Sequence, residues 1–75
     1  MYEHETIKEV KEVFKKVDAL KMDRQWDQAE MCLRAALRST RINLGEGHPL
    51  NTEVRKRIRQ LFEAEIAYNA VKPAH

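Results

Sequence analysis

Few residues of this chain could carry out covalent or acid–base chemistry. Neither Cys32 nor any serine has a base near it in the sequence that would complete a catalytic pair. His48 stands directly before Pro49 in a glycine-containing segment, which is typical of a capping or loop residue rather than an acid or base. Glu63 and Glu65 are two residues apart and would point to different faces of a helix. The sequence therefore predicts no catalytic residue and no enzymatic activity.

Metal and cofactor chemistry is also not indicated. His4, His48 and His75 are far apart, and none has a cysteine or histidine at ligand spacing. No glycine-rich loop that could hold a phosphate is present. Cys32 is the only cysteine, so it cannot form a disulfide within the chain, and its spacing suits a small core residue. The sequence predicts no metal site and no cofactor.

A basic run is the one remaining feature with binding chemistry of its own. Arg55, Lys56, Arg57 and Arg59 lie close together, and clustered cations of this kind can bind phosphates. Glu53 and Glu63, however, are spaced to pair at i,i+4 with Arg57 and Arg59 on a helix surface. The net charge of +2 is also mild for a nucleic-acid-binding domain. A small helical nucleic-acid-binding regulator is therefore the alternative interpretation, and nucleic acid is not the expected partner.

The sequence predicts that these residues lie on three helices. Charged residues make up 35% of the chain and aromatic residues 7%, with two glycines and two prolines, which favours helix over sheet. Apolar residues recur at intervals of three and four over residues 5–22, 25–43 and 49–71. Asp23 is expected to be an N-cap or turn residue, Gly45 to adopt positive φ, and Pro49 to begin the third helix. The prediction is one all-α domain spanning residues 1–75.

The third helix has an additional apolar stripe. Its main stripe includes Val54 and Leu61, and a second one is formed by Phe62, Ile66 and Ala70. One helix of a three-helix unit can bury only one stripe internally, so the second indicates an interface. We expect self-association, as a homodimer, through this second stripe.

Two segments of the chain repeat each other. Residues 12–20 and 53–61 are offset by 41 positions, and six of the nine pairs are identical or conservative. A period of this length is typical of arrays of helical hairpins, in which each unit buries its apolar face on its neighbour. The alternative is a chance match between two amphipathic helices rich in common helix-forming residues.

A second motif supports the array interpretation. Ala36-Leu37 followed by Leu44-Gly45-Glu46-Gly47-His48-Pro49 resembles the long tetratricopeptide repeat of the kinesin-light-chain type. The segment 21–30 resembles the turn between helices A and B of that family, and the resemblance covers residues 10–61. Arg24 and Val17 depart from it, because the family has glycine at the first position and a small residue at the second. About one and a half repeats are present, so either the chain is a fragment or self-association completes the array.

The resemblance implies a groove lined by the first and third helices. Such a groove would bind an extended segment that carries acidic side chains or a free carboxylate. The alternative is that the two phenylalanines among its residues are core or dimer contacts. The residues that the resemblance places in the groove are Lys11, Phe14, Asp18, Lys21, Thr52, Arg55, Arg59 and Phe62.

These observations predict a protein–protein interaction module of the adaptor or inhibitor type. No N-terminal apolar stretch follows Met1, and no apolar run approaches the length that crosses a membrane. A lone cysteine suits a reducing compartment, so we expect a cytoplasmic protein. Its expected partners are a protein, including an acidic or carboxylate-bearing segment, and a second copy of itself.

Overall fold

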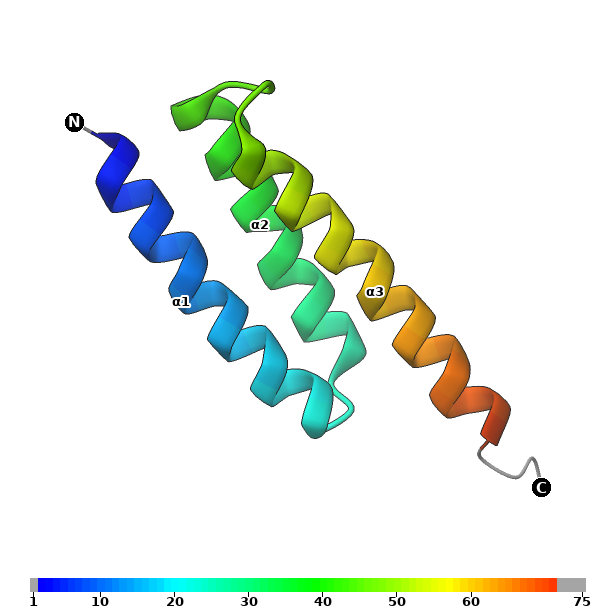
Figure 1. The fold of residues 1–75 in the computed structure, drawn as a ribbon. Coiled ribbons are helices and arrows are strands. Elements are labelled where there is room, and N and C mark those ends of the chain that lie inside the picture. Colours follow the sequence, from blue (N-terminus) through cyan, green and yellow to red (C-terminus); the bar gives the residue numbers. More distant parts are fainter. Residues whose placement is uncertain (1, 72–75) are drawn as a thin grey trace.

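The computed structural model describes residues 2–71, which form three α-helices. They are α1 (Tyr2–Met22), α2 (Trp26–Leu44) and α3 (Pro49–Val71). No strand occurs among the described residues. Helices α1 and α2 form an antiparallel hairpin, and α3 runs back along α2, so that α2 packs against both of the others (Figure 1). The all-α prediction is confirmed, although the last residues of the predicted domain, 72–75, lie outside the described part.

The helix bounds lie close to the expected ones. The first helix begins at Tyr2 rather than at residue 5, the second is shifted by one residue, and the third spans 49–71 as expected. Glu3 and Glu5 in the first turn of α1 stabilise its start, because negative charge is favourable near a helix N-terminus. None of the described helices combines the length and apolarity needed to cross a membrane.

The α1–α2 connection is a short turn with one residue in the left-handed region. Arg24 has a φ of 59°, a conformation that costs a non-glycine residue about 1 kcal/mol. Its guanidinium lies 4.7 Å from the centroid of the Tyr68 ring, a cation–π contact with α3 that offsets part of this cost. Asp23 lies in the turn, which confirms the turn alternative predicted for it, and the N-cap of α2 is Gln25.

The α2–α3 connection follows the expected chemistry. Gly45 adopts a φ of 87°, which a residue with a side chain rarely does. His48 Nδ1 accepts a hydrogen bond of 3.0 Å from the backbone N–H of Leu50, which confirms the capping interpretation. Pro49 is the first residue of α3, where its missing N–H leaves no donor unpaired.

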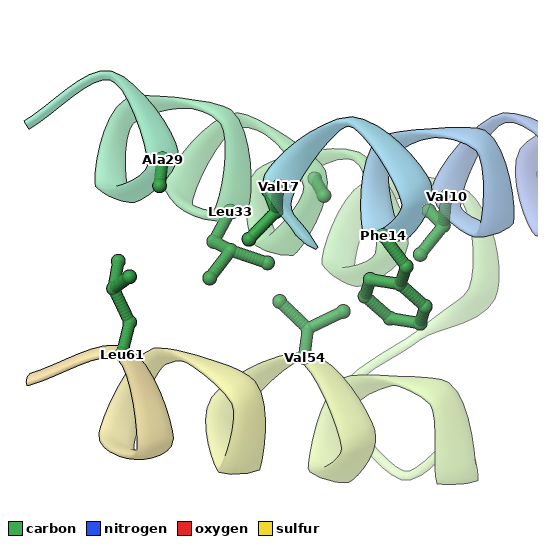
Figure 2. Packing of buried hydrophobic residues seen from close by; sticks show 8 residues of the cluster. Val10, Phe14, Val17, Ala29, Leu33, Val54 and Leu61 are labelled. Atoms are coloured by element: carbon green, nitrogen blue, oxygen red, sulfur yellow. The ribbon is translucent and has the colours of Figure 1, made fainter. Parts of the chain in front are cut away.

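The core lies where the three helices meet. Figure 2 shows Val54 and Leu61 of α3 pointing towards Leu33 of α2, with Val17 beside it. The full set of buried apolar residues is Val10, Phe14, Val17, Ala29, Leu33, Ala36, Val54 and Leu61. All eight belong to the apolar stripes predicted for the three helices.

Two side-chain hydrogen bonds tie the helices together beside this core. Thr40 Oγ1 lies 2.8 Å from Asn51 Oδ1, to which it donates, joining α2 to α3 at a fully buried position. Asn43 Nδ2 donates to Thr6 Oγ1 over 3.0 Å and joins α2 to α1. No buried side-chain nitrogen or oxygen of residues 2–71 lacks a hydrogen-bond partner. These bonds also show which faces of α2 point to α1 and to α3.

Candidate interaction surface

One arginine of α3, Arg57, covers the surface between α1 and α3. The Arg57 guanidinium stacks over the Phe14 ring, 4.0 Å from its centroid. Its Nη1 is 3.9 Å from Asp18 Oδ1, and its Nε donates to Glu53 Oε2 over 3.1 Å. The bond to Glu53 confirms the predicted i,i+4 pair. Arg57 therefore joins α1 and α3 where the resemblance implies an open groove.

Phe14 is not available to line such a groove. Its side chain is 8% exposed and lies in the core beside Val54, as Figure 2 shows. Of the alternatives considered for this ring, the structure shows the core one. Lys11 and Asp18 are exposed on α1, and Lys21 is half-buried.

The third-helix half of the predicted groove lies on another face. Arg55 and Arg59 are each two residues from Arg57, and two residues turn a helix by about 200°. Their side chains therefore point away from the side on which Arg57 contacts α1. Thr52 and Phe62 are each five residues from Arg57 and also turn away from it, by about 140°. The structure does not bring the two halves of the predicted set together.

A stripe of apolar residues on α3 extends from the core to the outer surface of the helix. Val54, Ile58, Phe62 and Ile66 follow at intervals of four, so each lies about 40° further around the helix. Exposure rises along the series, from buried Val54 through half-buried Ile58 to 37% for Phe62 and 67% for Ile66. An apolar stripe therefore runs from the core out to the surface, on the side of α3 away from Arg57.

Helix α2 contributes the other border of this face. Asn43, Thr40, Leu37 and Arg34 lie at intervals of three, each about 60° further around α2. Asn43 bonds to α1 and Thr40 to Asn51 of α3, so Arg34 lies past α3, on the outer side. Arg38 is two residues from Thr40 and therefore points away from α3, on the side of α2 where it lines a hollow with Arg41, Ile42 and Glu46.

The register between α2 and α3 determines which residues of the two helices lie at the same height. Thr40 bonds to Asn51, and the rings of Trp26 and Tyr68 are 5.9 Å apart between centroids. Because α2 and α3 are antiparallel, positions between these two contacts pair in reverse order. Arg34 therefore falls level with Arg59. We call the outer surface of α2 and α3 the acceptor face and define it as Arg34, Arg55, Ile58, Arg59, Phe62 and Ile66.

Carboxylates neutralise this border only in part. Arg34 Nε donates to Glu30 Oε2 over 2.7 Å. Arg55 and Arg59 form no ion pair with any residue of the described part of the chain. The expected i,i+4 pair of Arg59 with Glu63 is therefore absent there, and that expectation is wrong. The acceptor face combines an apolar centre with cations on both borders.

Hollows are present elsewhere on the described surface. Cys32 and Val13 line a groove of about 260 Å³ between α1 and α2 that also contains Glu9 and Lys16. Trp26 lies in a cleft of about 470 Å³ that also contains Asp23, Asp27 and Glu65. In this second cleft, Arg24 is a charged neighbour of the carboxylates and its guanidinium already covers the adjacent Tyr68 ring.

No arrangement suited to metal binding is found in residues 2–71. No three cysteine, histidine, aspartate or glutamate side chains gather there as metal ligands would. His48 is committed to the cap of α3, and its Nε2 lies 3.6 Å from Glu3 Oε2. His75 is outside the described residues.

The chain matches no protein-family model, no characterised protein and no solved structure.

Proposed function

We propose that this chain is a non-enzymatic protein–protein interaction module, of the adaptor or inhibitor type, that binds its partner through the acceptor face. The observation that carries the proposal is the apolar stripe that continues from buried Val54 to Ile66, which is 67% exposed. A stripe that continues the core onto the surface is typical of a site that another apolar surface covers.

Energetics support the same proposal. A core in a chain of about 75 residues rarely contributes more than about 3–5 kcal/mol. Covering Phe62 and Ile66 would add roughly 1.5–3 kcal/mol for each side chain. A partner on the acceptor face would therefore contribute stability comparable to that of the core.

The architecture also supports a tetratricopeptide-like unit. In helical-hairpin arrays each helix pair packs on the next, and α3 here packs on α2 as the first helix of a second pair would. On this proposal, the acceptor face is where a further helix packs. The lone Cys32 favours a reducing compartment, which supports a cytoplasmic location.

Partner capture should depend on Ile66. We expect the immobilised wild-type protein to retain a partner from nuclease-treated lysate and an Ile66→Glu variant to lose it, because the new charge would be buried without a counter-ion. The matched control is Ile42→Glu, since Ile42 is similarly exposed at 74% but lies at the opposite end of α2. Mass spectrometry of the retained proteins gives the readout. Equal capture by both variants would exclude the acceptor face as the docking surface.

Self-association is proposed as a competing use of the same face. Phe62, Ile66 and Ala70 are exposed along α3 and can be covered by the same stripe of a second copy. Light scattering should therefore give the mass of a homodimer at high protein concentration, and the monomer mass for Ile66→Glu. A monomer mass for the wild type at high concentration would contradict self-association and leave capture of another protein to be tested separately.

One observation favours the nucleic-acid alternative. Arg55, Lys56 and Arg59 have no ion pair among the described residues, so they are open to phosphates. Phe62 and Ile66, however, lie on the same side of α3 and offer nothing to a phosphate backbone. If binding is electrostatic, affinity for a DNA duplex falls by close to one log unit per contact for each log unit of salt. We expect only weak duplex binding that disappears at physiological salt.

A further inference from the structure

We propose that the partner of the acceptor face is an acidic amphipathic helix, which packs over α2 and α3 as a fourth helix. This inference rests on the proposed function and adds the chemistry of the partner. Three features carry it: the spacing of the apolar stripe, the cations on both of its borders, and the register that sets those cations level.

The spacing of the stripe favours a helix as the occupant. Ile58, Phe62 and Ile66 recur every four residues and form a ridge of the kind that packs into the groove of another helix. The face from Arg55 to Ile66 is about 16 Å long at 1.5 Å per residue, so a helix of about 11 residues covers it. Figure 1 shows α2 and α3 lying side by side over this length.

The charges define the sequence of that helix. Arg34, which pairs with Glu30, borders the apolar stripe on α2. Arg55 and Arg59, which are unpaired in the described part of the chain, border it on α3. Arg55 and Arg59 are four residues apart, which is the distance between carboxylates at i and i+4 on a partner helix. Arginine and carboxylate form charge-assisted hydrogen bonds that are stronger than neutral ones. The complementary helix therefore has an apolar stripe with glutamate or aspartate on both sides.

Because of the same charges, we expect a second copy of the chain to bind the acceptor face more weakly than an acidic helix does. Two copies that pair through Phe62 and Ile66 carry the same cations at the borders of their faces. Like charges brought together across an interface oppose association. An acidic helix covers the same apolar side chains and neutralises the arginines, so it displaces the second copy.

A labelled synthetic helix tests the inference. The probe is a fluorescein-labelled peptide of about 15 residues with leucine at helical spacing and glutamate on both flanks, and its matched control has glutamine in place of glutamate. Fluorescence anisotropy with the full chain should show binding of the acidic peptide at least about tenfold tighter than binding of the control. The charge-reversed variant R55E/R59E should lose at least that tenfold preference.

A second variant distinguishes binding at the acceptor face from non-specific electrostatic attraction between the acidic peptide and the protein. Lys11→Glu combined with Lys15→Glu makes the same change in net charge on the exposed surface of α1. We expect this variant to bind the acidic peptide within about twofold of the wild type at physiological salt, where distant charges are screened. Circular dichroism of each variant shows that its helical content is retained.

Each other outcome overturns a distinct part of the account. Equal binding of both peptides, lost in Ile66→Glu, overturns the acidic partner and leaves the proposed function standing. Loss of binding in the Lys11 and Lys15 variant, but not in R55E/R59E, moves the site to α1 and overturns the inference. Displacement of the peptide by a DNA duplex at physiological salt favours the nucleic-acid alternative. If neither peptide binds, the helix inference is wrong, and the lysate capture experiment decides the proposed function by itself.

Discussion

Replacing Leu33 by alanine is expected to leave a large fraction of the protein unfolded at room temperature. Leu33 is fully buried in the middle of α2, the helix that packs against both α1 and α3. Truncating a buried leucine costs about 2–5 kcal/mol, because transfer free energy is lost and a cavity remains. That cost is similar to the whole stability that a core of this size supplies, about 3–5 kcal/mol.

Urea or thermal unfolding followed by circular dichroism measures this effect. Met31→Ala is the matched control, since Met31 is exposed and only two positions away on the same helix. Its free energy of unfolding should stay within about 0.5 kcal/mol of the wild type. A Leu33→Ala protein as stable as Met31→Ala would show that α2 does not hold the core as described.

Replacing Asn51 by alanine is expected to cost about 1–3 kcal/mol, an unusually large loss for a polar residue. Asn51 is fully buried, accepts a hydrogen bond from Thr40 Oγ1 and donates from Nδ2 to the carbonyl oxygen of Gly45. Its removal takes a partner from the Gly45 carbonyl and leaves a cavity beside Thr40. It also frees the loop from which α3 starts.

Asn69→Ala is the control for this change. Asn69 is exposed near the end of α3, and alanine is the better helix former, so its free energy of unfolding should be unchanged or slightly higher. If denaturant unfolding shows equal stability for the two alanine variants, the buried bond between α2 and α3 contributes nothing.

The apolar periodicity of the sequence was sufficient to predict the helices and the core. Residues such as Val10, Leu33 and Val54 recur at helical spacing, and burial of one stripe per helix follows from that spacing alone. The buried polar pair of Thr40 and Asn51 is harder to predict. Thr40 lies at helical spacing from Leu33 and Ala36, whereas a polar residue such as Asn51 is recognised as core only when its partner on another helix is known.

The candidate surface was predicted on one helix and missed on the other. Phe62 and Ile66 stood out because they form a second stripe on α3. Arg34 did not, because its place beside that stripe depends on how α2 and α3 are rotated against each other. The periodicity of one helix does not determine the rotation of that helix relative to its neighbour.

The groove prediction depends on a similar angle. Carrying positions across by the 41-residue offset assumes that α1 and α3 present equivalent residues towards one shared space. In the structure Val54 of α3 lies beside Phe14 in the core, and Arg57 of α3 covers the Phe14 ring. Arg24 is a different case: its φ of 59° explains why a glycine is favoured at that position of the turn.

The most direct test of protein binding through the acceptor face is chemical-shift mapping of the isotope-labelled protein. The captured partner, unlabelled, is added stepwise while the backbone amide resonances are followed. We predict that the largest changes fall on residues 30–38 of α2 and 55–66 of α3, and that residues 8–18 of α1 stay close to their starting positions. Changes concentrated on Lys11, Asp18 and Arg57 instead would place the partner between α1 and α3 and would contradict the account.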